Sequence, residues 1–148
     1  MMSTDQDPVT NLRAEECWEL LEAEQFGRLA YHLVDEVHVV PINYVADAGA
    51  LLFRTASGNK LLAAALHSAV ALEIDWHDDM TAWSVLARGH LRQLEEDEEH
   101  RLDTLPLYPW TPTLKYDVVE LVPETVTGRV FRLHLDDDDR TAAHSGDG

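Results

Sequence analysis

Short connections between extended segments constrain this chain more than any other feature of its sequence. The residue pattern predicts strands over 28–34, 37–45 and 50–55, with tight turns at 35–36 and 46–49 between them. Connections of so few residues cannot carry the chain back along a sheet, as a parallel crossover requires. The three segments are therefore expected to form an antiparallel meander.

The rest of the chain adds a helix before this meander and further strands after it. Apolar residues, among them Leu12, Cys17 and Leu21, recur at helical spacing and predict a helix over 12–25 that Gly27 ends. Closing many short strands into a ring removes exposed edges, so we expect a small β-barrel. The other expected elements are strands over 69–76, 81–94, 116–122 and 125–135, and helices over 61–67 and 95–105.

The length of 148 residues favours a single domain. Residues 1–11 are polar and are expected to be a flexible arm, while 136–148 form an acidic tail without core residues, which we expect to be disordered. The folded domain is thus expected over 12–135. The sequence shows no secretory signal and no apolar run long enough to span a membrane, and its one cysteine suits a reducing compartment. We expect a cytoplasmic protein without a membrane partner.

The charge of the chain argues against nucleic-acid binding. Asp and Glu number 28 against 11 Lys and Arg, which gives a formal net charge of −17. A field of that sign repels phosphate backbones, and no basic patch of any length offsets it. The composition is compatible with a salt-loving source, in which counter-ions screen the repulsion, but an ordinary soluble acidic surface with two disordered ends is the simpler interpretation.

The segment 54–60 has the composition of an anion site. A strand ends at Arg54 and Thr55, a turn with the hydroxyl of Ser57 follows, and a helix is expected to begin after Lys60. Backbone N–H groups at a helix start, together with hydroxyls and two cations, suit a phosphate group. The alternative is ordinary capping, in which Ser57 closes the helix and the cations are solvated.

Pro41 interrupts the second predicted strand. Proline cannot donate a hydrogen bond to a ladder, so it marks a bulge, a strand edge, or a place where something other than a strand approaches.

Four groups of residues in this order and spacing resemble the pyridoxamine 5'-phosphate oxidase-like family of flavin proteins. The resemblance covers roughly residues 12–94, and the last third of the chain matches only loosely. The groups are Phe26-Gly27-Arg28-Leu29-Ala30, Val40-Pro41-Ile42-Asn43-Tyr44, Leu52-Phe53-Arg54-Thr55 with Gly58-Asn59-Lys60-Leu61, and Trp83-Ser84-Val85 with Arg88-Gly89.

The resemblance implies a mainly β fold, a split β-barrel of antiparallel strands with flanking helices, which forms a homodimer holding FMN at the subunit interface. It assigns three sets of cofactor contacts. The contacts to the phosphate are Arg54, Thr55, Ser57 and Lys60. The contacts along the flavin ring, largely through backbone groups, are Pro41, Ile42, Asn43 and Tyr44. The contacts from a neighbouring strand or from the partner subunit are Trp83, Ser84 and Arg88. For Tyr44 and Trp83, packing in the core or at the dimer interface is an equal alternative.

One departure bears on the activity. True oxidases of the family end in an arginine-rich segment that grips the substrate phosphate, and here Arg129 and Arg132 are only a fragment of it. We therefore expect a flavin-dependent oxidoreductase acting on another small molecule. The alternatives are a deazaflavin-dependent reductase and a flavin- or haem-binding protein without turnover.

No catalytic residue or metal site is predicted. The eight histidines include no pair at ligand spacing on a helix, and Cys17 lies on the apolar stripe of the first helix, where a core role is expected. The loop with Asp75, His77, Asp78 and Asp79 could line a site, but a solvated loop is the simpler interpretation. A bound flavin would itself carry the electron chemistry, so no strong acid or base is required.

Overall fold

The computed structural model describes residues 8–56, 63, 65–105 and 116–133. Its sheet is antiparallel throughout, as the short connections predicted. The elements are β1 (Val9–Asn11), α1 (Ala14–Ala23), β2 (Phe26–Leu33), β3 (Glu36–Asp47), β4 (Ala50–Ala56), β5 (Val70–His77), β6 (Thr81–Gln93), the 3₁₀ helix η2 (Glu99–Thr104) and β7 (Tyr116–Arg132).

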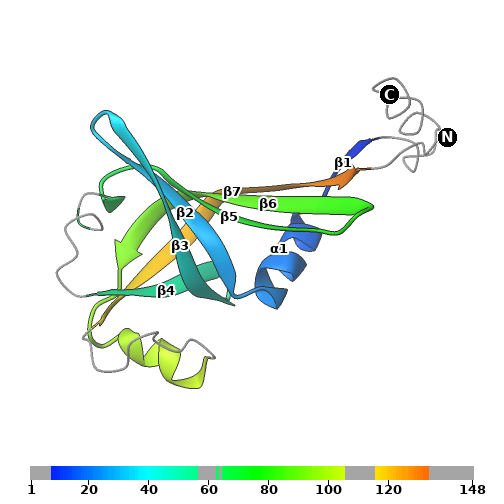
Figure 1. Cartoon of the computed structure of the whole chain (residues 1–148). Helices are drawn as coiled ribbons and strands as arrows, with labels where there is room; N and C mark the ends of the chain where they lie inside the picture. The colour runs from blue at the N-terminus through cyan, green and yellow to red at the C-terminus, as the bar shows by residue number, and fades with distance from the viewer. Residues whose placement is uncertain (1–7, 57–62, 64, 106–115, 134–148) are drawn as a thin grey trace, which may run out of the picture.

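The strands close into a ring. Their order is β1-β7-β4-β3-β2-β5-β6, and a further pairing of β7 with β6 joins the two sides of the sheet. Two of the seams are short: β2 pairs with β5 only over Arg28–Ala30, and β3 pairs with β4 only over Tyr44–Asp47. In Figure 1 the β2–β3 hairpin therefore projects well beyond the body of the barrel. This arrangement is the expected split barrel.

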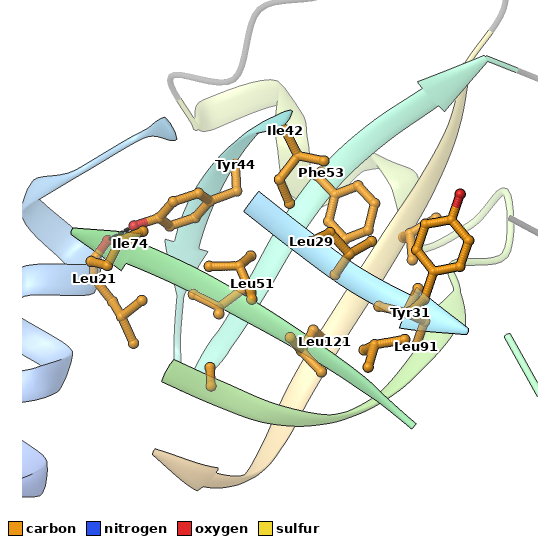
Figure 2. Packing of buried hydrophobic residues seen from close by; sticks show 14 of the residues in the cluster. Leu21, Leu29, Tyr31, Ile42, Tyr44, Leu51, Phe53, Ile74, Leu91 and Leu121 are labelled. Atoms are coloured by element: carbon orange, nitrogen blue, oxygen red, sulfur yellow. Dashed lines mark hydrogen bonds between the residues drawn. The ribbon is translucent and has the colours of Figure 1, made fainter. Parts of the chain in front are cut away.

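The core fills the ring with residues from nearly every strand. Leu51, Leu72, Val85 and Leu121 are fully buried, and Figure 2 shows side chains from β2, β3, β4 and β7 meeting there. Successive side chains of a strand point to opposite faces. Leucine and β-branched residues therefore occupy the positions that point into the core. A smaller cluster lies on the other side of β4 and consists of Val45, Leu52, Leu94 and Val118.

Helix α1 covers one end of the barrel. The backbone N–H of Arg13 donates to Glu16 Oε1 at 3.0 Å, and acidic residues occupy the first turn, where the helix dipole favours them. Cys17 and Leu21, on the side of this helix that faces the barrel, are fully buried, which confirms the core role expected for Cys17. Burial raises the pKa of the Cys17 thiol.

The structure corrects the role expected for Gly27. The helix ends at Ala23, and Gly27 lies inside β2. A Cβ placed on Gly27 would meet the backbone O of Glu73 at 2.8 Å, so the residue must be glycine for β2 to approach β5.

The predicted helix over 95–105 is also corrected. The segment forms turns followed by η2, because four glutamates close together repel one another in an α-helix. Ion pairs hold the segment against the barrel instead. Arg92 reaches Glu98 and Glu120 at 2.9 Å each, and Arg101 reaches Glu120 at 2.7 Å and Asp47 at 3.2 Å.

The last two predicted strands are a single one. Strand β7 runs through Pro123, which is opposite Gly89 while Thr125 is opposite Arg88, so Glu124 is the extra residue of a bulge. The bulge accommodates the proline that suggested a break.

Two smaller differences concern the ends of strands. Leu33 pairs with Glu36, so the hairpin turn is Val34-Asp35, one residue earlier than expected, and Val34 has a φ of 52°. Val9–Asn11, at the end of the expected flexible arm, pair with β7. The predicted helix over 61–67 and the expected tail over 136–148 lie largely or wholly outside the described residues.

Gly27→Ala should lower the free energy of unfolding by about 1–3 kcal/mol, because the new methyl group meets backbone that cannot move cheaply. Urea unfolding followed by circular dichroism measures this change. Ala30→Ser adds one atom to the outer side of the same strand and should stay within about 0.5 kcal/mol of wild type. Equal effects of the two substitutions would contradict the close approach of β2 to β5.

Acid should loosen the 95–105 segment. A hydrogen bond from Arg92 lowers the pKa of Glu98 to about 2; burial raises the pKa of Glu120, but hydrogen bonds from Arg101 and Arg92 outweigh it, so that pKa is lowered too. Both carboxylates therefore stabilise the fold above an unfolded-state pKa of about 4.3, and that contribution is lost as the pH falls toward the folded-state values.

The test is unfolding free energy measured from pH 6 down to about pH 2.5, across the window in which that contribution is lost. Glu120→Gln should remove part of the loss of stability with acid, whereas Glu22→Gln, on the exposed side of α1, should not. A Glu120→Gln curve parallel to wild type would show that this network does not couple stability to pH.

Candidate functional site

Strands β3 and β4 separate at the place where the sequence predicted cofactor contacts. Their ladder stops at the pair Tyr44–Phe53. Beyond it, β3 continues along β2, whereas Arg54 and Thr55 continue along β7, opposite Val118 and Asp117. No described strand pairs with the Glu36–Asn43 part of β3 on its side away from β2. The divergence sets the predicted ring contacts on one side of the open seam and Arg54 and Thr55, the described phosphate contacts, on the other.

Backbone direction explains why Pro41 is tolerated there. The N–H of Tyr44 donates to the backbone O of Gln25 at 2.9 Å, so the backbone groups of Tyr44 point toward β2. Directions alternate along a strand, so those of Asn43 and Pro41 point to the side that β4 leaves. Pro41 thus breaks no bond with Arg28, its partner on β2. Of the three interpretations of Pro41, the strand edge is confirmed.

The four predicted ring contacts divide between two faces of β3. The side chains of Ile42 and Tyr44 are buried in the core, 9% and 0% exposed, whereas Pro41 is exposed and Asn43 half-buried on the opposite face. The Tyr44 hydroxyl donates to the backbone O of Leu21 at 2.8 Å, as Figure 2 shows. Burial raises the pKa of Tyr44 far above its usual range. Neither the hydroxyl nor the backbone N–H of Tyr44 is therefore left for a ligand.

The phosphate contacts are partly described. Arg54 and Thr55 are half-buried at the end of β4, and both make interactions with other residues. Ser57 and Lys60 lie outside the described residues, so the structure does not test them. The residues that are described fit an oxyanion, since Arg54 lies at a strand end beside the expected turn.

The contacts predicted on β6 also divide. Trp83 packs against the main core, which is its packing alternative, while Ser84 and Arg88 are on the outer face of the sheet. That outer face also carries Pro41 and Arg28, because paired residues of neighbouring strands project to the same side. Ser84 and Arg88 therefore share a face with Pro41, and Trp83 does not.

A cluster that the sequence analysis missed lies beside Pro41 on the outer face. Arg28 forms ion pairs with Glu73, at 2.7 Å, and with Asp75. Burial raises the pKa of Glu73, and hydrogen bonds with Glu73 and Arg28 lower the pKa of Asp75. Alternation of Glu73 and Asp75 on one strand was the available signal, but their partner is 45 residues away from Glu73.

The structure also has a hollow of about 570 Å³ between the end of β6 and the start of β7. It is lined by Gln93, Leu94, Glu95, Glu96, Glu99, Tyr116 and Asp117. Its carboxylates do not favour a phosphate, although Asp117 and Tyr116 in its lining pair with Thr55 and Ala56 at the end of β4. The Asp75–Asp79 loop instead closes on itself: Asp78 Oδ1 accepts from the N–H groups of Met80 and Thr81, which lowers the pKa of Asp78.

Comparison with known proteins places the chain in a family. The sequence pattern of the pyridoxamine 5'-phosphate oxidase family matches residues 13–130, and the chain belongs to that family. No described helix is long and apolar enough to cross a membrane.

Solved structures and sequence relatives agree with this assignment. The FAD binding protein from Mycobacterium smegmatis is 40% identical, with a TM-score of 0.77 over 84% of this chain and 100% of that one. A conserved protein of unknown function from Corynebacterium diphtheriae is 35% identical, with a TM-score of 0.73 over 84% and 99%. An uncharacterized Mycobacterium tuberculosis protein is 42% identical over 83 residues, 55% of this chain and 76% of its own length.

Tyr44→Phe should lower the free energy of unfolding by about 1 kcal/mol, because the carbonyl of Leu21 loses its buried donor. Chemical denaturation measures the loss. Tyr31→Phe is a matched control on the neighbouring strand, since no hydroxyl hydrogen bond of Tyr31 is described. A Tyr44→Phe protein as stable as wild type would contradict the anchoring of β3 to α1 through this hydroxyl.

Proposed function

We propose that this protein binds a flavin nucleotide where β3 and β4 diverge, and that it acts as a flavin-dependent oxidoreductase. The observation that carries the proposal is the end of the ladder at Tyr44–Phe53, which sets the outward backbone of Asn43 across from Arg54 and Thr55. Family membership over residues 13–130 supports the flavin part of the proposal.

The residues have separable roles in this proposal. The backbone of Pro41 and Asn43 would align with the edge of the flavin ring, and Arg54 and Thr55, with Ser57 and Lys60, would hold its phosphate. A bound flavin supplies hydride and electron transfer. The buried side chains of Ile42 and Tyr44 keep β3 rigid beneath the ring position.

The proposal does not depend on whether the flavin is FMN or FAD. The sequence resemblance favours FMN, while the 40% identical M. smegmatis relative is named for FAD. Both carry the same ring and first phosphate, so the proposed contacts serve either. Deazaflavin shares them as well and is an outcome of the binding test.

We further propose that the protein is a homodimer in the cytoplasm, with the outer face of the β2–β3 hairpin in the interface. Val34, Val37 and Val39 are 93%, 77% and 60% exposed there. Valines so exposed on one hairpin mark an interaction surface. The interface would place Ser84 and Arg88 of one protomer near the flavin of the other.

Purified protein should retain FMN or FAD after removal of excess ligand and show a flavin absorption spectrum. Arg54→Ala and Lys60→Ala should each weaken binding about tenfold or more, because each removes a charge from the phosphate. Arg13→Ala, whose arginine pairs with Glu16 on α1, should leave affinity unchanged. Protein that takes up neither flavin nor deazaflavin would refute the proposal, and preference for deazaflavin would replace the oxidoreductase assignment with a deazaflavin-dependent one.

Dimerisation should strengthen with salt, because two chains of charge −17 repel each other and counter-ions screen that repulsion. Light scattering after size exclusion measures the mass. Val39→Glu should yield monomers at moderate salt, whereas Val122→Glu, a valine also exposed but on β7, should not. A dimer that survives Val39→Glu would exclude this hairpin from the interface.

A further inference from the structure

Among the arginines that the structure describes, two on the outer face make no ion pair or hydrogen bond with another described residue. Arg13, Arg28, Arg92 and Arg101 form ion pairs with carboxylates, and Arg54 and Arg132 also interact with other residues. Arg88 and Arg129 are exposed, and within the described part of the chain neither makes a hydrogen bond or an ion pair. In a chain with 28 acidic residues, two arginines on one face without a partner among the described residues are unusual.

The strand register places these arginines at the ends of one hydroxyl-bearing strip. On β6 and β7, Arg88 is opposite Thr125, Leu86 is opposite Thr127, and Ser84 is opposite Arg129. Paired residues project to the same side, so all six side chains share a face. Gly128, between Thr127 and Arg129, faces Cys17 of α1, which confirms that its neighbours in sequence point outward.

The carboxylates on the residues flanking this strip already have partners. Glu73 and Asp75 on the neighbouring β5 are held by Arg28, and Glu124 is held by His90 at 2.7 Å. No carboxylate lies among the six residues of the strip. The strip itself therefore carries two cations and no anion, which favours an anion there over the rest of an acidic surface.

The spacing indicates the kind of anion. Ser84 and Arg88 are four residues apart, about 14 Å along a strand. Two long arginine side chains can converge from the ends of that span, and the hydroxyls between them can donate to further oxygens. A single carboxylate would leave one end unused, whereas two linked phosphoryl groups offer oxygens to both.

We propose that the Arg88–Arg129 strip binds the diphosphate group of a small molecule that works with the flavin. Candidate sources of this group are a nucleoside diphosphate and a reduced nicotinamide dinucleotide acting as electron donor. The role as a donor or substrate site rests on the proposed flavin function, but the binding site itself stands on the geometry of β6 and β7.

The experiment is isothermal titration calorimetry of the full chain with pyrophosphate, at constant ionic strength. We expect one site in flavin-loaded protein and the same site in apo Arg54→Gln, whose flavin phosphate position is impaired. Arg129→Gln and Arg88→Gln should each weaken binding about tenfold or more, and Thr127→Val by less, because a charged contact is worth more than a hydroxyl. Arg13→Gln is the matched control and should bind as wild type does.

Further titrations distinguish a nucleoside diphosphate from a nicotinamide dinucleotide, and they test the strip separately from the flavin function. ADP and NADH are titrated in the same way; binding of NADH with bleaching of the flavin identifies the electron donor, and binding of ADP alone a nucleoside diphosphate. If the protein binds flavin but does not bind pyrophosphate, or if Arg129→Gln leaves pyrophosphate binding unchanged, only this inference is overturned. Pyrophosphate binding lost in Arg129→Gln, without any flavin binding, upholds the strip and refutes the flavin function.

Discussion

The divergence of β3 from β4 is the constraint on which the account of this protein depends. Each strand keeps a partner on its other side, β2 for β3 and β7 for β4, so the ring stays closed although the ladder between them is short. A strand that lost both neighbours would fray. Here the sheet tolerates one incomplete seam because β6 and β7 pair over most of their length and hold the barrel together.

A few arginines form ion pairs with the acidic residues that are partly or fully buried in the fold. Glu120 is 6% exposed and accepts from both Arg92 and Arg101, which fastens the 95–105 segment over the smaller cluster beside β4. A buried carboxylate without partners would be costly, so the two arginines are needed where the surface turns inward. The Arg28 cluster similarly joins β2 to β5 across the other short seam.

Much of the fold was predictable from local pattern. Alternation and turn residues located β2 to β6 to within about two residues at each end, because half-buried strands record their burial in period-two sequence. Non-local effects were not predictable. Gly27 is required by Glu73, Pro123 is accommodated by a bulge opposite Gly89, and the ion pairs that replace the 95–105 helix involve Asp47 and Glu120.

The candidate site likewise has features that the sequence could predict and features that depend on non-local pairing. The resemblance named Pro41, Asn43, Arg54 and Thr55, and these residues lie on the two strands that border the open seam between β3 and β4. It could not tell that Tyr44 and Trp83 face the core, because facing depends on the register with neighbouring strands. Nor could it find Arg129 as a neighbour of Ser84, since these residues are far apart in sequence and meet only through β6–β7 pairing.

The most direct test of the central claim is a backbone amide NMR titration of isotopically labelled protein with FMN and with FAD. The account predicts that the largest shifts fall on the amides of Asn43, Arg54 and Thr55, where β3 and β4 part. Amides lining the hollow between β6 and β7, such as Glu96 and Glu99, should not move. Shifts concentrated at the hollow, with Asn43 and Thr55 unchanged, would contradict a flavin site at the open seam.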